Sequence, residues 1–375
     1  MKESWERRDV LRLAASTMLA GMVTGRDARA SLSGSAEPEP AEPKNVSQRM
    51  RNKKLLAIPD NNWVQLKAMM PPERKGGAEV FWAYDAKNKL IVHYGGCTSP
   101  YTNEGWVFDL GTEKWTMRWP HDPDAPADRP VGGCSRGLAF DSKRGLVWIY
   151  GGASNGGLGK GSRGLYSLDA ALDKWTPADG KWVKPSLDMS PPEGNALAYD
   201  SVNDLLVSIG HARSGANDVH VFDLQKRVWR GGAVDPVRNT GASYVPLTFD
   251  PGIGKFVYFN FAGQTWTYDA KADRWTQLKP QVEPPGPRHH SGLAYDSQNK
   301  VHILCGGRGA KDSLLNDLWV YDAQANTWTE MKPKRPGPKI DTMLFSYDEE
   351  HNVCVLADYR PTTPMYVYRY QRARK

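Results

Sequence analysis

The feature that most constrains the fold is a repeated pair, an aromatic residue followed by Asp. Six copies occur: Tyr84-Asp85, Phe140-Asp141, Tyr199-Asp200, Phe249-Asp250, Tyr295-Asp296 and Tyr347-Asp348. Successive copies lie 46 to 59 residues apart, and each stands between two short apolar stretches. Two apolar stretches around a short polar turn predict a β-hairpin, and a period of this length is typical of repeat architectures.

Each copy carries further marks at fixed distances. Ten residues after the Asp a glycine occurs in four copies, whereas Asn260 and Asp358 stand there in the other two. A second pair ending in Asp follows in five copies, and a tryptophan lies six residues beyond each of those Asp residues. These tryptophans are Trp115, Trp175, Trp229, Trp275 and Trp328.

The sixth copy lacks its tryptophan. Its second pair is Tyr368-Arg369, and the sequence ends six residues later. A tryptophan at the right distance stands at the other end, where Trp63 precedes Trp115 by 52 residues. We therefore predict that the strand around Trp63 completes the sixth repeat unit. The two ends of the chain would then pair, the units would form a closed ring, and no sheet edge would be exposed.

This pattern of Gly-Gly, aromatic-Asp and Trp resembles the kelch repeat over residues 63–375. The resemblance implies an all-β fold, a six-bladed kelch-type β-propeller with four antiparallel strands per blade and a ring closed by an N-terminal strand. It also implies that the tryptophans pack between neighbouring blades. The repeated Trp and Asp residues are accordingly expected to be structural, because repeat positions are packing positions.

The first thirty residues have the features of an export signal. A basic stretch containing Arg7 and Arg8 precedes an apolar run, and the segment ends in Ala-Arg-Ala at Ala30. The run ERRDVLR around the two arginines resembles the twin-arginine export signal, although Val10 stands where Phe is usual. We predict a signal peptide at 1–30 and a periplasmic or extracellular protein; the alternative is a short amphipathic helix.

Residues 31–54 are predicted to form a disordered linker, because Pro, Glu and Ser give the segment little apolar surface to bury. The propeller is predicted to occupy 55–375, and no stretch is apolar enough to span a membrane. The formal charge of +7 falls to +5 without the first thirty residues, which hold six basic and four acidic groups. That charge is too small to argue for a nucleic-acid partner. We expect a monomer.

The loops around the channel mouth are the expected place for a site. In a kelch blade the second strand ends on the face where the next blade begins, so both kinds of loop share one face. The predicted ligand-binding residues are Arg74, Arg129, Arg213, Arg288, Arg308, Arg360 and Tyr101; Arg136, His289 and Asp341 lie in the same loops. Converging guanidinium groups would bind a carboxylate, sulfate or phosphate, unless they are solvated or pair with nearby acids.

Glu193, His211 and His290 are candidate acids or bases by their position in these loops. His290 also lies in the run GPRHHSGLAYD, which resembles the kelch consensus most closely and favours a structural role for Arg288 and His290. Adjacent histidines point to opposite faces of an extended chain, so His289 and His290 are not expected to bind one metal together. His93 and His302 lie in strands and are expected in the core.

The four cysteines are not at zinc-binding spacing. Cys97 and Cys134 are both expected at the channel face of adjacent blades, where a disulfide or two buried thiols would fit an exported protein. Cys305 and Cys354 lie in second strands and are expected to pack in the core. No metal and no cofactor is predicted.

Three functions compete. The first is a binding propeller that holds an acidic small molecule, a glycan or a protein partner at its channel face. The second is a carbohydrate-active enzyme, because blade number, export and a basic mouth resemble the periplasmic kelch sialate mutarotases, whose substrate is an acidic sugar. The third is a copper radical oxidase, which is disfavoured because the sequence has no Tyr-His dipeptide of the kind that site uses.

Overall fold

The computed structural model describes residues 51–71, 81–96, 101–124, 129–154, 164–171, 173–177, 193–211, 219–233 and 246–371. At 153, 154, 177, 193–195 and 211 it describes the backbone alone. These residues belong to one compact unit, Asn45–Lys375, and the predicted signal peptide lies outside them. Within the described ranges, no helix has the length and apolar character to cross a membrane.

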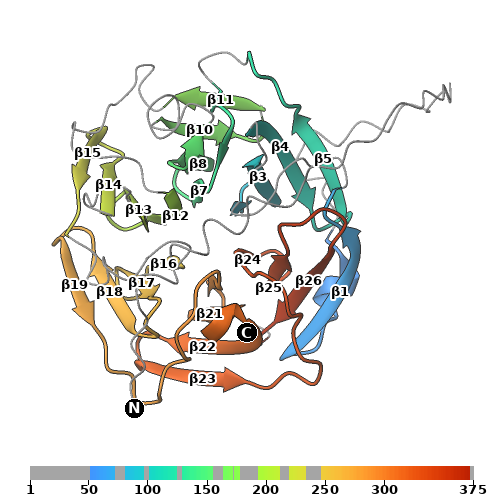
Figure 1. Ribbon diagram of the computed structural model, residues 1–375, viewed down its shortest axis with the longest axis vertical. Helices are drawn as coiled ribbons and strands as arrows, with labels where there is room; N and C mark the ends of the chain where they lie inside the picture. Colours follow the sequence, from blue (N-terminus) through green and yellow to red (C-terminus); the bar gives the residue numbers. More distant parts are fainter. Residues whose placement is uncertain are drawn as a thin grey trace. The chain divides into compact units, whose positions relative to one another are not determined.

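Six four-stranded antiparallel sheets are arranged as blades around a common axis in this unit (Figure 1). The first three blades are β2 (Trp82–Asp85), β3 (Leu90–Gly96), β4 (Thr102–Asp109) and β5 (Lys114–Trp119); β7 (Gly137–Asp141), β8 (Leu146–Tyr150), β10 (Leu165–Asp169) and β11 (Lys174–Pro177); and β12 (Glu193–Asp200), β13 (Leu205–His211), β14 (Val219–Asp223) and β15 (Val228–Gly231). The chain is therefore an all-β propeller, as the repeat predicted.

The last three blades follow in the same order around the ring. They are β16 (Leu247–Asp250), β17 (Lys255–Phe259), β18 (Thr265–Asp269) and β19 (Arg274–Gln277); β20 (Gly292–Asp296), β21 (Val301–Arg308), β22 (Leu314–Asp322) and β23 (Thr327–Met331); and β24 (Leu344–Asp348), β25 (Val353–Ala357), β26 (Pro364–Arg369) and β1 (Asn62–Met69). Four short elements complete the described structure: α2 (Lys53–Leu56), the 3-10 turn η3 (Ala310–Asp312) and the paired strands β6 (Gly133–Cys134) and β9 (Ala153–Ser154).

The repeated Asp residues close the hairpin turns. The Oδ1 atom of Asp296 accepts hydrogen bonds from the backbone N–H groups of Gln298 and Asn299, at 3.1 and 3.0 Å. Lys300 then takes a left-handed conformation, with φ of 57°, before β21 begins. The same bonds to the turn are made by Asp85, Asp141, Asp200, Asp250 and Asp348. Asp is therefore needed at each turn because its short side chain caps the backbone.

The repeated tryptophans lie between blades. Trp328 of blade 5 packs on Phe259 of blade 4 with ring centroids 5.4 Å apart, and its indole N–H donates to Thr265 at 2.9 Å. Trp175 of blade 2 packs on Tyr94 of blade 1 at 4.6 Å. Each such ring buries a large apolar surface against the preceding blade, so the tryptophans join the blades into one ring.

The ring closes through β1, as the missing sixth tryptophan predicted. β1 pairs antiparallel with β26, and Trp63 stands opposite Tyr368 with ring centroids 5.0 Å apart. The Tyr368 hydroxyl donates to the side chain of Asn61 at 2.8 Å. Figure 1 shows β1, from the blue end of the chain, beside β26 at the red end. The last blade therefore combines both ends of the described chain.

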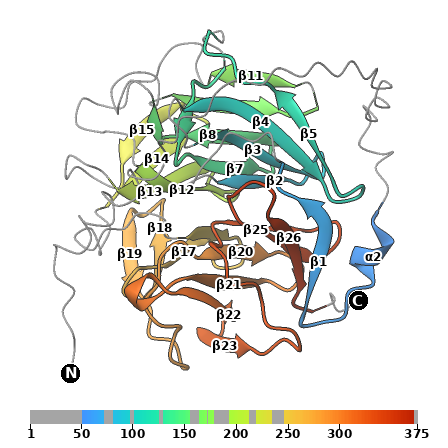
Figure 2. The same ribbon diagram turned by 45° about the vertical axis from the view of Figure 1, so that its right-hand side comes forward.

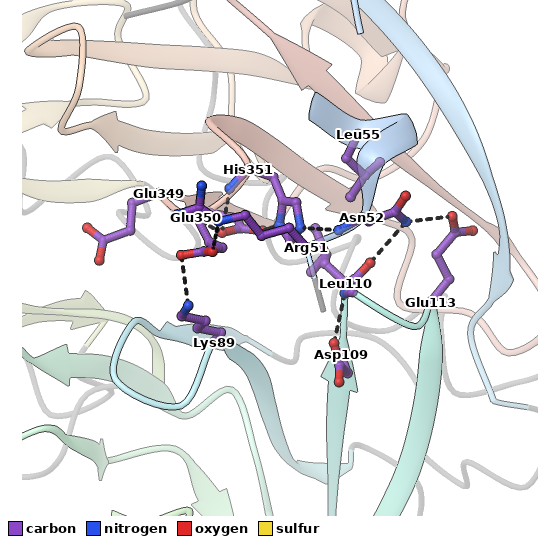
Figure 3. Close-up of polar contacts among 12 residues, drawn as sticks. Arg51, Asn52, Leu55, Lys89, Asp109, Leu110, Glu113, Glu349, Glu350 and His351 are labelled. Atoms are coloured by element: carbon purple, nitrogen blue, oxygen red, sulfur yellow. Dashed lines mark hydrogen bonds and ion pairs between the residues drawn. The ribbon is translucent and has the colours of Figure 1, made fainter. Parts of the chain in front are cut away.

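The short helix α2 is drawn to the right of β1 in Figure 2. Asn52 caps the helix by accepting from the Lys54 N–H at 3.1 Å, and its amide donates to the Leu110 carbonyl and to Glu113 of blade 1 at 3.2 and 3.0 Å. The Asn52 N–H donates to Nε2 of His351 in blade 6 at 3.0 Å (Figure 3). Residues 51–54 of the predicted linker thus bind to two blades.

Further contacts hold the same segment. Arg51 pairs with Glu350, which also binds Lys89 at 3.0 Å (Figure 3). Leu55 is 2% exposed, and its carbonyl accepts from the buried Arg369 guanidinium at 2.8 Å. We call this set of contacts around Arg51, Asn52 and Leu55 the N-terminal latch.

The two faces of the propeller differ in what they carry. The hairpin turns after the first and third strands lie on one face, the turn face, where the N-terminal latch binds. The loops after second strands and before first strands lie on the other, the loop face. There Gly307 has φ of 94°, and a Cβ atom on it would lie 2.6 Å from the His289 carbonyl oxygen. Glycine is needed because one loop crosses closely over the other.

Candidate functional site

The predicted arginines of the loop face have acceptors of their own wherever the structure describes them. Arg74 and Arg213 lie outside the described residues. Arg129 donates to the carbonyls of Asn103 and Pro120, both at 2.6 Å. Its guanidinium therefore holds loops together.

Arg288 is 4% exposed and is bound on several sides. It donates to both carboxylate oxygens of Asp317 at 2.7 Å and to the carbonyls of Gly286 and Gly306 at 3.1 and 3.0 Å. A buried guanidinium with a paired carboxylate is a structural unit, because removing either partner leaves a buried charge alone. This agrees with the structural role that the kelch consensus favoured for Arg288.

Arg308 and Arg360 each hold a carboxylate through the same guanidinium edge. Nε and Nη2 of Arg308 donate to the two oxygens of Asp341 at 2.8 and 2.6 Å, while Nη1 binds Asp312 at 2.6 Å. Arg360 binds Asp358 in the same way, through Nε at 2.9 Å and through Nη2. The positive charge of both arginines is therefore matched by acids, which is the alternative that the sequence left open.

The structure describes the remaining predicted site residues and the cysteines only in part. Glu193 and His211 are direct partners across β12 and β13, and only their backbone is described. Tyr101 precedes β4, where its carbonyl lies against Gly132 of the next blade. Cys134 is disulfide-bonded. Cys97 lies outside the described residues, so the pairing of Cys134 with Cys97 stays a prediction. Cys305 and Cys354 are free thiols in the core.

His290 is the candidate acid or base whose surroundings are described. It belongs to a loop-face cluster of Phe261, His289, His290, Arg308 and Asp341. His289 stacks on Phe261 with centroids 5.4 Å apart, and His290 meets the edge of His289 at 4.7 Å. Nδ1 of His290 lies 3.3 Å from Oδ1 of Asp341. The cluster joins the loops of blades 4, 5 and 6.

The electrostatics of this cluster are fixed by its packing. Asp341 is 3% exposed, and although burial alone would raise its pKa, hydrogen bonds from Arg308 and His290 hold that pKa well below its usual range. Burial lowers the pKa of His289 to about 4, with help from the neighbouring charge of His290. At neutral pH the cluster therefore holds a buried, ionised carboxylate and a neutral imidazole.

The side chains of His289 and His290 retain 17% and 16% of their surface exposed. The cluster can therefore offer an aromatic surface and imidazole hydrogen bonds to a ligand, while the Arg308–Asp341 pair fixes its geometry. Phe261 was missed because it stands outside the repeat positions, and its stacking on His289 depends on the contact between blades.

His93 and His302 lie in the core, as the sequence predicted. Both are 0% exposed. His302 contacts Asp250 and Thr248 through its two ring nitrogens, at 3.1 and 2.8 Å. Burial lowers the pKa of His302, so this imidazole packs between blades 4 and 5 as a structural group.

No group of three His, Cys, Asp or Glu side chains that could hold a metal occurs within the described ranges.

The repeat itself matches a known family motif. Residues 290–335, which include all four strands of blade 5, match the kelch motif. Together with the six four-stranded blades, this match makes the chain a kelch-type β-propeller. Kelch propellers commonly bind ligands or protein partners.

Similar proteins support the same class. Kelch domain-containing protein 3 of Bos taurus is 23% identical over 261 residues, 62% of this chain and 63% of that protein. Kelch domain-containing protein 10 of Xenopus tropicalis is 25% identical over 190 residues, 46% of this chain and 45% of that protein. Acyl-CoA-binding domain-containing protein 4 of Arabidopsis thaliana is 26% identical over 183 residues, 43% of this chain. The match covers only 27% of the Arabidopsis protein.

Proposed function

We propose that the chain is an exported kelch propeller that binds a ligand or a protein partner through its loop face. The observation that carries this proposal is the loop-face cluster, in which a rigid ion pair supports two partly exposed imidazoles and a stacked phenyl ring. Preorganised aromatic and polar groups are what a recognition surface needs, because little ordering remains to be done when the partner arrives. The arginine-rich loops belong to the scaffold of this surface.

The ligand form of the proposal is tested by thermal unfolding of the full chain with N-acetylneuraminate, D-glucuronate, D-galactose and D-glucose. A ligand at about 100 times its dissociation constant stabilises the folded state by roughly 2.7 kcal/mol. We expect a rise in Tm with at least one sugar, lost in Phe261→Ala. The matched control is Val202→Ala on the turn face, where Val202 is 60% exposed.

The outcomes separate the forms of the proposal. A rise that survives Phe261→Ala would place binding elsewhere and contradict the assignment to the cluster. The absence of any rise would exclude these sugars and favour the protein-partner form. Export is checked on the same protein, since the exported product should begin at Ser31.

A second function is favoured by the contact between His290 and Asp341. An imidazole oriented by an ionised carboxylate can move a proton, so the pair fits the acid or base that a sialate mutarotase-like enzyme would need near the anomeric carbon. Exchange between the anomers of N-acetylneuraminate, followed by NMR, is the readout. Under this function His290→Gln should slow the exchange at saturating sugar; equal rates in both proteins and in buffer would exclude it.

A further inference from the structure

Arg136 occupies a position that the repeat does not require to be charged. It stands five residues before Asp141, and the equivalent residues of blades 5 and 6 are Ser291 and Met343. The residues before Arg136 and Ser291 both take the left-handed conformation, with φ of 57° and 54°. Blades 2 and 5 therefore share this left-handed residue, and in blade 5 the position after it accepts a small neutral side chain. A structural demand of the fold does not explain the guanidinium.

The side chain of Arg136 is enclosed on the loop face of blade 2. Its Cγ atom would lie 2.6 Å from a Cβ atom placed on Gly152, so the side chain runs directly over this glycine, which follows β8. The residue is 4% exposed, and its Nε and Nη2 atoms are buried. Among the residues that the structure describes, neither nitrogen has a hydrogen-bond partner.

The described groups that act on this guanidinium carry no negative charge at neutral pH. They are the phenols of Tyr94 and Tyr166, and burial raises the pKa of Tyr94 to about 12. The Tyr94 hydroxyl is itself engaged, since it donates to the Pro130 carbonyl at 2.6 Å and accepts from Arg129 at 3.2 Å. Burial lowers the pKa of Arg136, yet an arginine keeps its proton in proteins. A positive charge is thus buried without a counter-charge among these groups.

Other arginines of the chain show what this guanidinium edge binds. Arg308 uses Nε and Nη2 to hold both oxygens of Asp341, and Arg360 uses the same two nitrogens for Asp358. The equally buried Arg288 has a carboxylate and two carbonyls. In Arg136 the same Nε and Nη2 edge has no hydrogen-bond partner in the described part of the chain. Two parallel N–H groups on one edge match two oxygens of a single oxyanion.

We propose that Arg136 is the binding group of a recessed anion site between blades 1 and 2, which takes a small carboxylate, sulfate or phosphate through Nε and Nη2. The site is separate from the loop-face cluster and does not depend on the proposed function. A bound oxyanion would supply the missing counter-charge, because an uncompensated buried charge is strongly destabilising. The ligand must be small, since Arg136 is only 4% exposed.

The test compares the thermal unfolding of the full chain in sodium chloride, acetate, sulfate and phosphate at equal ionic strength and pH 7. The variant is Arg136→Met, which keeps an apolar stem and removes the charge. The control is Arg274→Met, which removes one positive charge from an exposed position on the outer strand β19. Comparing variants within each salt cancels the general stabilisation that sulfate gives to folded proteins.

We expect at least one oxyanion to raise the Tm of the wild type and of Arg274→Met above that of Arg136→Met by several degrees, in a saturable manner. The anion that does so identifies the class. In chloride alone, Arg136→Met should be at least as stable as the wild type, because it removes a buried unpaired charge. An equal response of all three proteins to every salt, or a lower Tm of Arg136→Met in chloride, would overturn the site.

A direct measurement guards against a variant that fails to fold. The Nε–H signal of Arg136 in a ¹⁵N NMR spectrum of the wild type should shift saturably with the effective anion, and no saturable shift with any of the three would refute the site. The Phe261→Ala protein should keep this response. Failure of sugar binding at the cluster and failure of the anion site are therefore distinguishable.

Discussion

Single charged residues are treated in two ways in this propeller. Arg288 and Arg308 are held by carboxylates and act as rigid pins in the loops. His289 instead stacks on Phe261, and its imidazole is neutral at neutral pH. The first arrangement secures the shape of the loop face, and the second keeps an aromatic surface available on it.

Because His289 is buried, we predict that the stability of the propeller depends on pH. Its folded pKa is lowered to about 4 by burial and by His290, despite the opposing charges of Asp312 and Asp341, whereas the unfolded value is about 6.5. As the pH falls, the unfolded chain therefore binds the proton first. The contribution of the neutral, buried His289 to the free energy of unfolding is fully present above about pH 6.5 and is lost as the pH falls toward 4.

Urea unfolding at pH 7 and pH 5 measures this contribution. His289→Phe keeps a ring against Phe261 but cannot bind a proton, so its midpoint should fall less between the two pH values than that of the wild type. An equal fall in both proteins would contradict the assignment. The NMR titration midpoint of His289 in the wild type should lie near 4.

At the scale of elements, β1 carries the closure of the ring. It supplies the outer strand of the last blade and the ring of Trp63, which is 4% exposed against blade 5. Trp328 has the equivalent place between blades 4 and 5 and is 1% exposed. A closing strand and an internal strand should therefore contribute similarly to the stability of the ring.

We predict that deleting residues 55–67 abolishes cooperative unfolding, because the last blade loses its outer strand and Trp63. Trp63→Ala and Trp328→Ala should each lower the free energy of unfolding by about 3–5 kcal/mol. Urea unfolding measures all three. A chain lacking residues 31–43 is the control of equal length and should unfold like the full chain; the same behaviour after deletion of 55–67 would disprove closure through β1.

The sequence predicted the elements well because the repeat positions have local physical causes. An Asp at each turn caps backbone N–H groups, and a tryptophan six residues after the second pair meets the preceding blade. The site was less predictable. Whether an arginine pairs with an acid depends on loops from different blades, as in the contact of Arg308 with Asp341. Arg136 could have been singled out by aligning the six copies, where Ser291 and Met343 take its place.

At the scale of the whole molecule, the N-terminal latch joins the first and last blades on the turn face. His351 connects them, because its Nδ1 contacts Asp348 at 2.6 Å while its Nε2 accepts from the Asn52 N–H. Asn52 in turn donates to the Leu110 carbonyl of blade 1. One imidazole in blade 6 thereby positions a helix that contacts both blades.

We predict that His351→Ala releases α2, because the Asn52 N–H loses its acceptor. Limited trypsin digestion of the full chain, followed by mass spectrometry, should show faster cleavage after Lys53 and Lys54 in the variant. Cleavage after Lys271, in an exposed turn of blade 4, serves as the internal control and should be unchanged. If cleavage after Lys53 and Lys54 keeps its wild-type rate, the latch does not depend on His351.

The antiparallel pairing of β1 with β26 also sets how the propeller would respond to mechanical force. Asn62 stands opposite Arg369, so the chain enters and leaves this ladder at the same end. Opposed pulls on the two ends would load one pair at a time and unzip the ladder, instead of shearing all its pairs together. The contacts of Asn52 with two blades stand in front of that first pair, so they bear a pull on the N-terminal side before the ring can open.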